Sequence, residues 1–225
     1  MDNDTLRDKI LSTVVRKSTL KQEVFDASFA VMNELKETLF EMAAEMDEQL
    51  DGRLDKRVRI EYRDRGKFEA QVQIADDQLI FRMHTDTFRF EHSHDVWKTP
   101  YVAANADNAY CGVVNIYNFL SDSFKYNRNG DEGYLIGRLF INRERSFFAE
   151  GKGLPFGVQS FGQKPIDRES LMAVLEAAID YSLNFDLLMP PYEAEQRVTV
   201  DQFNTRMDNS KFTTGKRLDY PIDAE

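Results

Sequence analysis

The sequence predicts an α+β fold in which helices cover one mainly antiparallel sheet. Three observations indicate this fold. Before Gly52, apolar residues recur three or four positions apart, which is the spacing of an amphipathic helix. After Gly52 they alternate with polar residues through three short runs, as in strands that have one buried face. Helical spacing then returns between Leu171 and Met189, near the end of the chain.

The chain begins with a predicted amphipathic helix. Asn3 or Asp4 provides a side chain that can cap its first turn, and Thr5 and Asp8 have the spacing of a capping box. One face of this helix is apolar and consists of Leu6, Ile10, Leu11, Val14 and Val15. We expect this face to contact a second copy of the protein.

A second helix is predicted to follow a break at residues 16–19, because Ser18 or Thr19 is a good new cap. It ends near Leu50, before Gly52. Its broad apolar stripe includes Val24, Val31, Leu35, Leu39, Met42 and Met46. Such a stripe either packs on the protein's own sheet or pairs with the same helix of another copy. We favour the sheet for this helix and predict that the first helix makes a homodimer.

The next part of the chain is predicted to form a three-stranded antiparallel meander. Apolar and polar residues alternate over 56–63, 67–74 and 79–83. Tight turns are expected at Arg65-Gly66 and at Asp76-Asp77. The alternation changes phase at 85–87, which indicates a bulge or a turn.

Residues 106–126 fit two structures. As a strand, this segment is long and apolar on both faces. As a helix, it places Tyr110, Val114, Tyr117 and Phe124 near one side. Gly112 and the β-branched residues argue against a helix, whereas length and spacing favour one. We predict a helix.

A β-hairpin and a final helix complete the predicted fold. The hairpin strands are 134–141 and 146–150, after a loop at 127–131. Asp167 is the expected cap of the last helix, which ends before Pro190-Pro191. The inner residues of this helix are predicted to be Leu171, Leu175, Ala178, Ser182, Phe185 and Met189.

These elements divide the chain into a helical extension (1–17), a single α+β domain (18–204) and a loosely ordered tail (205–225). The predicted order is helix, three strands, helix, two strands, helix. This order resembles that of small acidic secretion-chaperone-like domains, which dimerise and bind unfolded segments of their partners. The likeness is one of element order.

The charge of the chain argues against nucleic acid and membranes as partners. Lys and Arg total 29 and Asp and Glu total 39, so the net charge is −10 and phosphate backbones and anionic membranes are repelled. A basic segment between Arg53 and Lys67 is best interpreted as the solvated face of a hairpin. No apolar run has membrane-spanning length.

The cysteine content and the N-terminus indicate a cytoplasmic location. Cys111 is the single cysteine, so the chain has no internal disulfide and no cysteine-based zinc site. The acidic start, Met1-Asp2-Asn3-Asp4, lacks the basic and apolar parts of a signal peptide. We therefore expect a cytoplasmic protein.

Two short motifs are candidates for chemistry, and each has a plainer alternative. His92 and His94 lie two residues apart, so an extended backbone places both imidazoles on one face, as a metal site requires. The alternative is a loop with ordinary hydrogen-bonding histidines. Glu150 and Lys152 resemble half of a metal-dependent nuclease signature, but the acidic residue needed on the preceding strand is missing.

A group of tyrosine and asparagine side chains suits recognition, because these side chains combine apolar area with hydrogen bonding. The candidate binding residues are Tyr110, Asn115, Tyr117, Asn118 and Tyr126. We predict a non-enzymatic domain, chaperone-like or an adaptor, that binds a protein or peptide and requires no cofactor. The alternative function is a metal-dependent hydrolase or nuclease.

Overall fold

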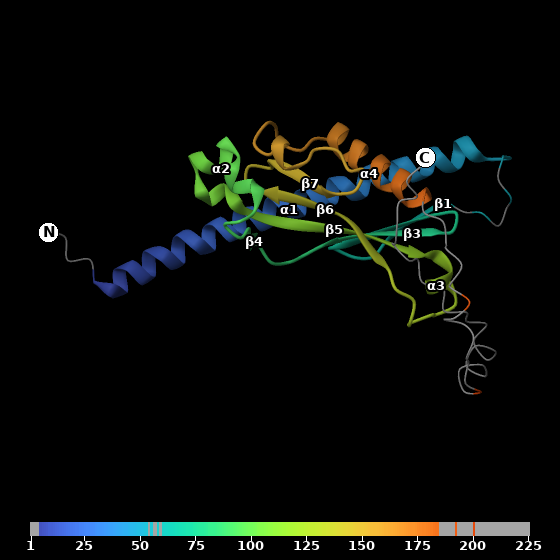
Figure 1. Ribbon diagram of the computed structural model, residues 1–225, viewed down its shortest axis with the longest axis horizontal. Helices are drawn as coiled ribbons and strands as arrows, with labels where there is room; N and C mark the ends of the chain where they lie inside the picture. Colours follow the sequence, from blue (N-terminus) through green and yellow to red (C-terminus); the bar gives the residue numbers. More distant parts are fainter. Residues whose placement is uncertain are drawn as a thin grey trace.

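The protein is built on a mainly antiparallel open sheet with a long N-terminal helix and a C-terminal helix, which confirms the predicted α+β class (Figure 1). The computed structural model describes residues 5–53, 55, 58, 60–184, 192 and 200. Phe185, Met189 and the predicted tail, 205–225, lie outside the described residues.

Seven strands form the sheet within the described residues. They are β1 (Ile60–Asp64), β2 (Glu69–Ile74), β3 (Asp77–Met83), β4 (Phe88–Arg89), β5 (Tyr110–Leu120), β6 (Tyr134–Asn142) and β7 (Phe147–Gly151). Their order is β1-β2-β3-β5-β6-β7, every pair is antiparallel, and β4 pairs with β5 beyond the end of β3. The predicted meander and hairpin are therefore confirmed, as is the interruption before Phe88.

The described helices differ greatly in length. They are α1 (Leu6–Leu50), α2 (Pro100–Ala104), α3 (Ser121–Lys125) and α4 (Arg168–Leu183), with the single 3₁₀ turns η1 (Asp95–Lys98), η2 (Ala106–Ala109) and η3 (Val158–Ser160). None of these helices is both long enough and apolar enough to cross a membrane.

Helix α1 is continuous for 45 residues, so the predicted break at 16–19 is wrong. Ser18 and Thr19 are good helix caps, but capping residues are also tolerated on the solvent side of an unbroken helix. Both are exposed. The predicted capping box is present: Asp8 N–H donates to Thr5 Oγ1 (3.3 Å), and Thr5 N–H donates to Asp8 Oδ2 (3.2 Å).

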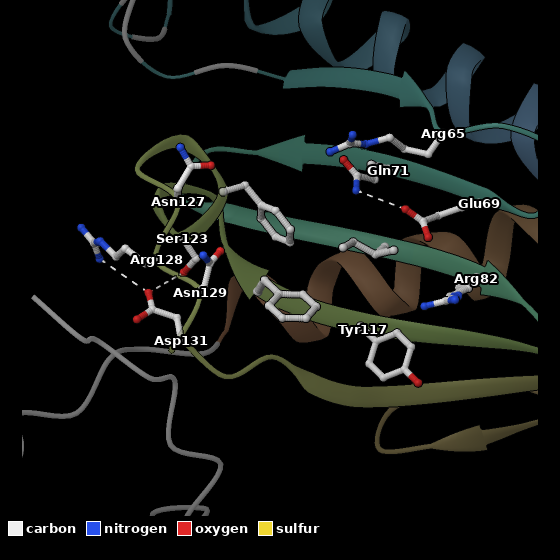
Figure 2. Close-up of a pocket in the computed structure, with 13 residues that line it drawn as sticks. Arg65, Glu69, Gln71, Arg82, Tyr117, Ser123, Asn127, Arg128, Asn129 and Asp131 are labelled. Atoms are coloured by element: carbon white, nitrogen blue, oxygen red, sulfur yellow. Dashed lines mark hydrogen bonds and ion pairs between the residues drawn. The ribbon is translucent and has the colours of Figure 1, made fainter. Parts of the chain in front are cut away.

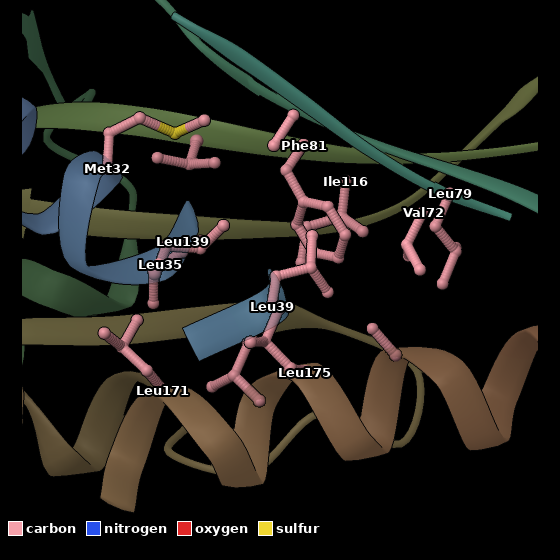
Figure 3. Close-up of a cluster of buried hydrophobic side chains, with 14 of the residues drawn as sticks. Met32, Leu35, Leu39, Val72, Leu79, Phe81, Ile116, Leu139, Leu171 and Leu175 are labelled. Carbon is pink, nitrogen blue, oxygen red and sulfur yellow. The ribbon is translucent and has the colours of Figure 1, made fainter. Parts of the chain in front are cut away.

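The main core lies between one face of the sheet, called here the inner face, and helices α1 and α4 (Figure 3). Leu35 and Leu39 of α1 meet Leu171 and Leu175 of α4 and Phe81 of β3, and all five are at most 1% exposed. The stripe of α1 therefore packs on its own sheet, as the sequence favoured.

A second core covers one end of the opposite, outer face. The segment between β4 and β5 folds over this face and contributes Val96 and Val102. The strands contribute Cys111, Phe140 and Phe148, which point away from the main core. The other end of the outer face is left open beside α3.

The predicted helix at 106–126 is wrong, because most of this segment is the strand β5. This strand lies in the middle of the sheet between β3 and β6. Val114 and Ile116 face the main core, while Cys111 and Val113 face the second core. A strand that is covered on both faces is apolar throughout and lacks the alternation of a half-exposed strand. The predicted element order, which resembled that of secretion-chaperone-like domains, is therefore wrong at its middle helix, where the structure has the strand β5.

Helix α4 begins at the predicted cap. Asp167 Oδ1 accepts hydrogen bonds from Ser170 N–H (2.8 Å) and Ser170 Oγ (2.6 Å), and Lys164 Nζ lies 3.0 Å from Asp167 Oδ2. These donors lower the pKa of Asp167 from its ordinary value of 3.8 to about 2. The predicted inner residues Leu171, Leu175, Ala178 and Ser182 are buried.

Asp167→Ala is expected to lower the free energy of unfolding by about 1 kcal/mol at neutral pH, because the cap is lost. The pKa of the Asp167 carboxyl is lower in the folded than in the unfolded chain, so its charge stabilises the fold above about pH 4. That contribution is lost as the pH falls towards 2. Urea unfolding at several pH values measures both effects.

Asp167→Asn is the matched control for this prediction, since the amide oxygen still caps the helix. Its stability relative to the natural protein should fall slightly at pH 7 and become equal near pH 2. A difference between the two proteins that does not change with pH would contradict the role of the charge.

Candidate functional site

A pocket of about 560 Å³ opens on the uncovered end of the outer face (Figure 2). Strands β2, β3 and β5 form its floor, the β1–β2 loop lies on one side, and α3 with the loop that follows lies on the other. It is lined by Arg65, Glu69, Gln71, Ile80, Arg82, Tyr117, Phe119, Ser123, Phe124, Asn127, Arg128, Asn129 and Asp131.

The floor of the pocket is apolar and aromatic because of the strand register. Gln71 of β2 is opposite Ile80 of β3, and Ile80 is opposite Tyr117 of β5. Two positions along β5, Phe119 again points outward. Its ring meets that of Phe124 of α3 edge to face, with 5.2 Å between the centroids. These side chains offer a ligand apolar area that is only partly covered by the protein itself.

Two exposed arginines border this floor, and a third, Arg128, belongs to the wall and points toward Asp131. Arg65 comes from the β1–β2 loop, Arg82 from β3 and Arg128 from the loop after α3 (Figure 2). Arg65 and Arg82 are exposed. Arg82 lies directly across from Glu69 in the ladder of β2 and β3. The rim therefore combines cationic groups with a smaller number of acidic ones.

The wall beside α3 is held by a buried polar cluster. The side chain of Asp131 is 2% exposed and that of Arg128 is 12% exposed, with Arg128 Nη1 3.8 Å from Asp131 Oδ2. Ser123 Oγ donates to the same Oδ2 (2.7 Å), and the backbone N–H of Arg128 donates to the Ser123 carbonyl (2.8 Å). Asp131 Oδ1 accepts no hydrogen bond although it is buried. Such an atom is costly to bury unless a ligand or solvent donates to it.

The lining offers groups that can bind carboxylates, apolar side chains and a peptide backbone. Guanidinium groups bind carboxylates through paired hydrogen bonds, and the aromatic floor accepts apolar side chains. Asn127 and Asn129 add exposed amides, which donate to and accept from a peptide backbone. No histidine, cysteine or lysine is among the residues that line the pocket.

Comparison with known protein families, with curated proteins and with solved structures finds no match to this chain. The site must be interpreted from its own geometry.

The structure separates the five binding residues that the sequence suggested. Tyr117 lines the pocket. Asn115 points to the same face one row away, opposite Arg82. Tyr126 is exposed just after α3, whereas Asn118 is 2% exposed on the inner side of the sheet. Tyr110 lies at the far end of β5, with the Arg89 guanidinium 5.6 Å from its ring centroid.

The structure brings one residue of each proposed metal motif together: His94 pairs with Glu150. His94 Nε2 lies 2.8 Å from Glu150 Oε1, and His94 Nδ1 accepts a hydrogen bond from the Val96 N–H (3.1 Å). Nδ1 is therefore an acceptor, so Nε2 carries the proton that is donated to Glu150. His92 instead stacks on Trp97, with 4.7 Å between the ring centroids.

Both nitrogens of His94 are thus engaged with protein groups, and Glu150 is one of its partners. Within the described part of the chain, no three His, Cys, Asp or Glu residues are grouped so that they could hold a metal ion. We therefore interpret the pair of His94 and Glu150 as a link between η1 and β7 that holds the second core in place.

Several pocket residues were not singled out from the sequence, namely Arg82, Arg128 and Asp131. Arg65 was noted, but only as part of a solvated basic segment. The alternation in β3 does place Arg82 on the polar side of that strand. The sequence alone does not show that this side lies near residues 121–131, because that approach depends on the pairing of β5 with β3.

Proposed function

We propose that this protein is a non-enzymatic binding domain, an adaptor or chaperone-like protein, whose outer-face pocket binds an extended acidic segment of a partner protein. The observation that carries the proposal is the pair of exposed arginines, Arg65 and Arg82, beside an aromatic floor, in a chain with a net charge of −10. A local basic site attracts acidic ligands, while the net negative charge of the rest of the protein repels other anionic surfaces.

A peptide fits this lining better than a nucleic acid. Glu69 and Asp131 lie among the arginines and would repel a continuous phosphate backbone, whereas a peptide can alternate carboxylates with apolar side chains. The amide side chains can pair with peptide N–H and C=O groups. A cytoplasmic location belongs to the same proposal, since Cys111 is a buried free thiol.

The test uses fluorescence polarisation with two labelled peptides, one alternating glutamate with phenylalanine and one alternating lysine with phenylalanine. The acidic peptide should bind and the basic peptide should not. Arg82→Glu should weaken binding of the acidic peptide at least tenfold, about 1.4 kcal/mol, since it removes one partner and adds repulsion. Tyr117→Ala should weaken it by a similar factor through loss of the floor.

Arg138→Glu is the matched control. Arg138 is exposed on the outer face, two strands from Arg82 in the same row of the sheet, and it does not line the pocket. Its replacement changes the net charge equally and should alter binding less than twofold. Equal losses from both arginine variants would mean that only the overall charge matters, and the assigned pocket would be wrong.

A further inference from the structure

The first part of α1 projects beyond the rest of the protein (Figure 1). We call residues 6–19 the arm. Every residue of the arm is exposed, and the described part of the chain leaves its apolar side chains uncovered. Their exposed fractions are 75% for Leu6, 53% for Ile10, 55% for Leu11, 55% for Val14 and 66% for Val15. A continuous exposed apolar row of this kind marks an interaction surface.

Charges are segregated along α1. The arm contains four basic residues and one acidic residue, whereas residues 34–50 contain six acidic residues and one lysine. That lysine, Lys36, is buried and pairs with Asp64 (2.9 Å). The helix dipole favours the opposite arrangement, and the last turn of α1 has no basic residue. The stability of the helix alone therefore does not explain this pattern.

An antiparallel pair of α1 helices from two copies would match these charges. Arg16 of the arm pairs with Asp107 of its own chain (3.1 Å), and the remaining basic residues of each arm would lie along the acidic part of the other copy. One two-fold axis would relate the two contacts. Like charges would meet if the two helices were parallel. The overall charge of the two ends of α1 therefore favours the antiparallel orientation.

One side of α1 has a matching row of exposed side chains, called here the seam. The seam consists of Leu11, Val15, Gln22, Asn33, Phe40 and Ala44. Separations of four, seven and eleven residues keep these positions near one side of a helix. Phe40, which is 56% exposed, is the large apolar residue of the acidic part.

The seam is symmetric about its midpoint. When two copies run antiparallel with Val15 opposite Phe40, Leu11 meets Ala44 and Gln22 meets Asn33. The same alignment places Arg7 level with Glu48 and Asp8 level with Asp47. A row that is complementary to itself in this way fits a second copy of the same chain, because an unrelated partner would not require the symmetry.

We propose that the protein forms a two-fold symmetric dimer through antiparallel pairing of α1, with Val15 of each copy opposite Phe40 of the other. Leu6 and Ile10 continue the side of α1 that packs on the sheet farther along, which is the side opposite the seam, so this pairing leaves them uncovered. This dimer is independent of the pocket on the outer face.

Cysteine cross-linking of the full chain tests the alignment. Val15→Cys and Phe40→Cys variants are purified separately, mixed and oxidised. A disulfide-linked dimer should form in the mixture and not in either variant alone, since equal positions on the two helices would be about 37 Å apart. Cys111 does not interfere, because it is buried and burial raises the pKa of its thiol.

The control mixes Val15→Cys with Glu48→Cys. Glu48 is also exposed on α1, but it lies about 12 Å farther along the helix, so this mixture should remain unlinked. Sedimentation equilibrium should show that the natural protein is a dimer and that Val15→Glu weakens it at least tenfold, whereas Ile10→Glu, which adds the same charge on the opposite side of the helix, should have little effect. A monomer, or strong linking of Val15→Cys to itself, would overturn the proposal.

Discussion

Gly112→Val is expected to lower the free energy of unfolding by about 3 kcal/mol, one of the largest single effects in this protein. Gly112 lies in β5 directly beneath α1. A Cβ atom at this position would be 2.2 Å from Ser28 Oγ and 2.8 Å from Ser28 Cβ. Ser28 is fully buried, and its hydroxyl donates to the Val24 carbonyl (2.7 Å), so it has little freedom to move. The helix and the central strand would have to separate.

Two further variants give this prediction its control. Gly130→Ala adds a methyl group where no other atom lies within 4 Å, so the free energy of unfolding should change by less than about 0.5 kcal/mol. Ser28→Gly, combined with Gly112→Ala, should restore part of the stability that Gly112→Ala alone removes. Urea unfolding measures all of these. Additive losses in the double variant would mean that the two residues do not collide.

The parts of the fold that the sequence predicts correctly are those with local signals. In β2 and β3, alternation marks the buried side, and the turn between them is short. The hairpin of β6 and β7 is likewise bounded by a polar turn. Asp167 is recognisable as a cap because its acceptor precedes a helical stripe. Each of these features depends on residues close together in the chain.

The wrong predictions depend on residues far apart in the chain. β5 lacks alternation because the second core covers its outer face, and that cover comes from the segment that precedes it. Gly112, unfavourable in a helix, is required by the close approach of Ser28. The break expected in α1 at Ser18 is absent because polar residues at this site simply face solvent.

The candidate site was predicted least well for the same reason. Its arginines come from three separate segments, and only strand pairing brings Arg65, Arg82 and Arg128 to one pocket. Of the five predicted binding residues, Tyr117 lines the pocket. The separation of Tyr110 and Tyr126 at opposite ends of β5 follows from its being an extended strand of 11 residues.

Phe148→Ala is expected to lower the free energy of unfolding by about 4 kcal/mol. Phe148 is completely buried on the outer side of β7. Its ring lies 4.9 Å from that of Phe140 and 5.1 Å from that of Phe161, measured between centroids. Phe90 packs against it at 5.5 Å. Truncation therefore leaves a cavity where three segments meet.

The loss should appear first in the second core, because this cluster is smaller than the main core and holds the segment between β4 and β5 and the region of η3 on the sheet. Trp97, the single tryptophan, packs in this cluster, so its fluorescence reports on it. In Phe148→Ala the fluorescence transition in urea should precede the circular dichroism transition of the whole fold. Phe88→Ala, at a residue that is 41% exposed, is the control and should cost less than about 1 kcal/mol. If the fluorescence and circular dichroism transitions of Phe148→Ala coincide, and both occur at the urea midpoint of the natural protein, Phe148 does not stabilise the second core.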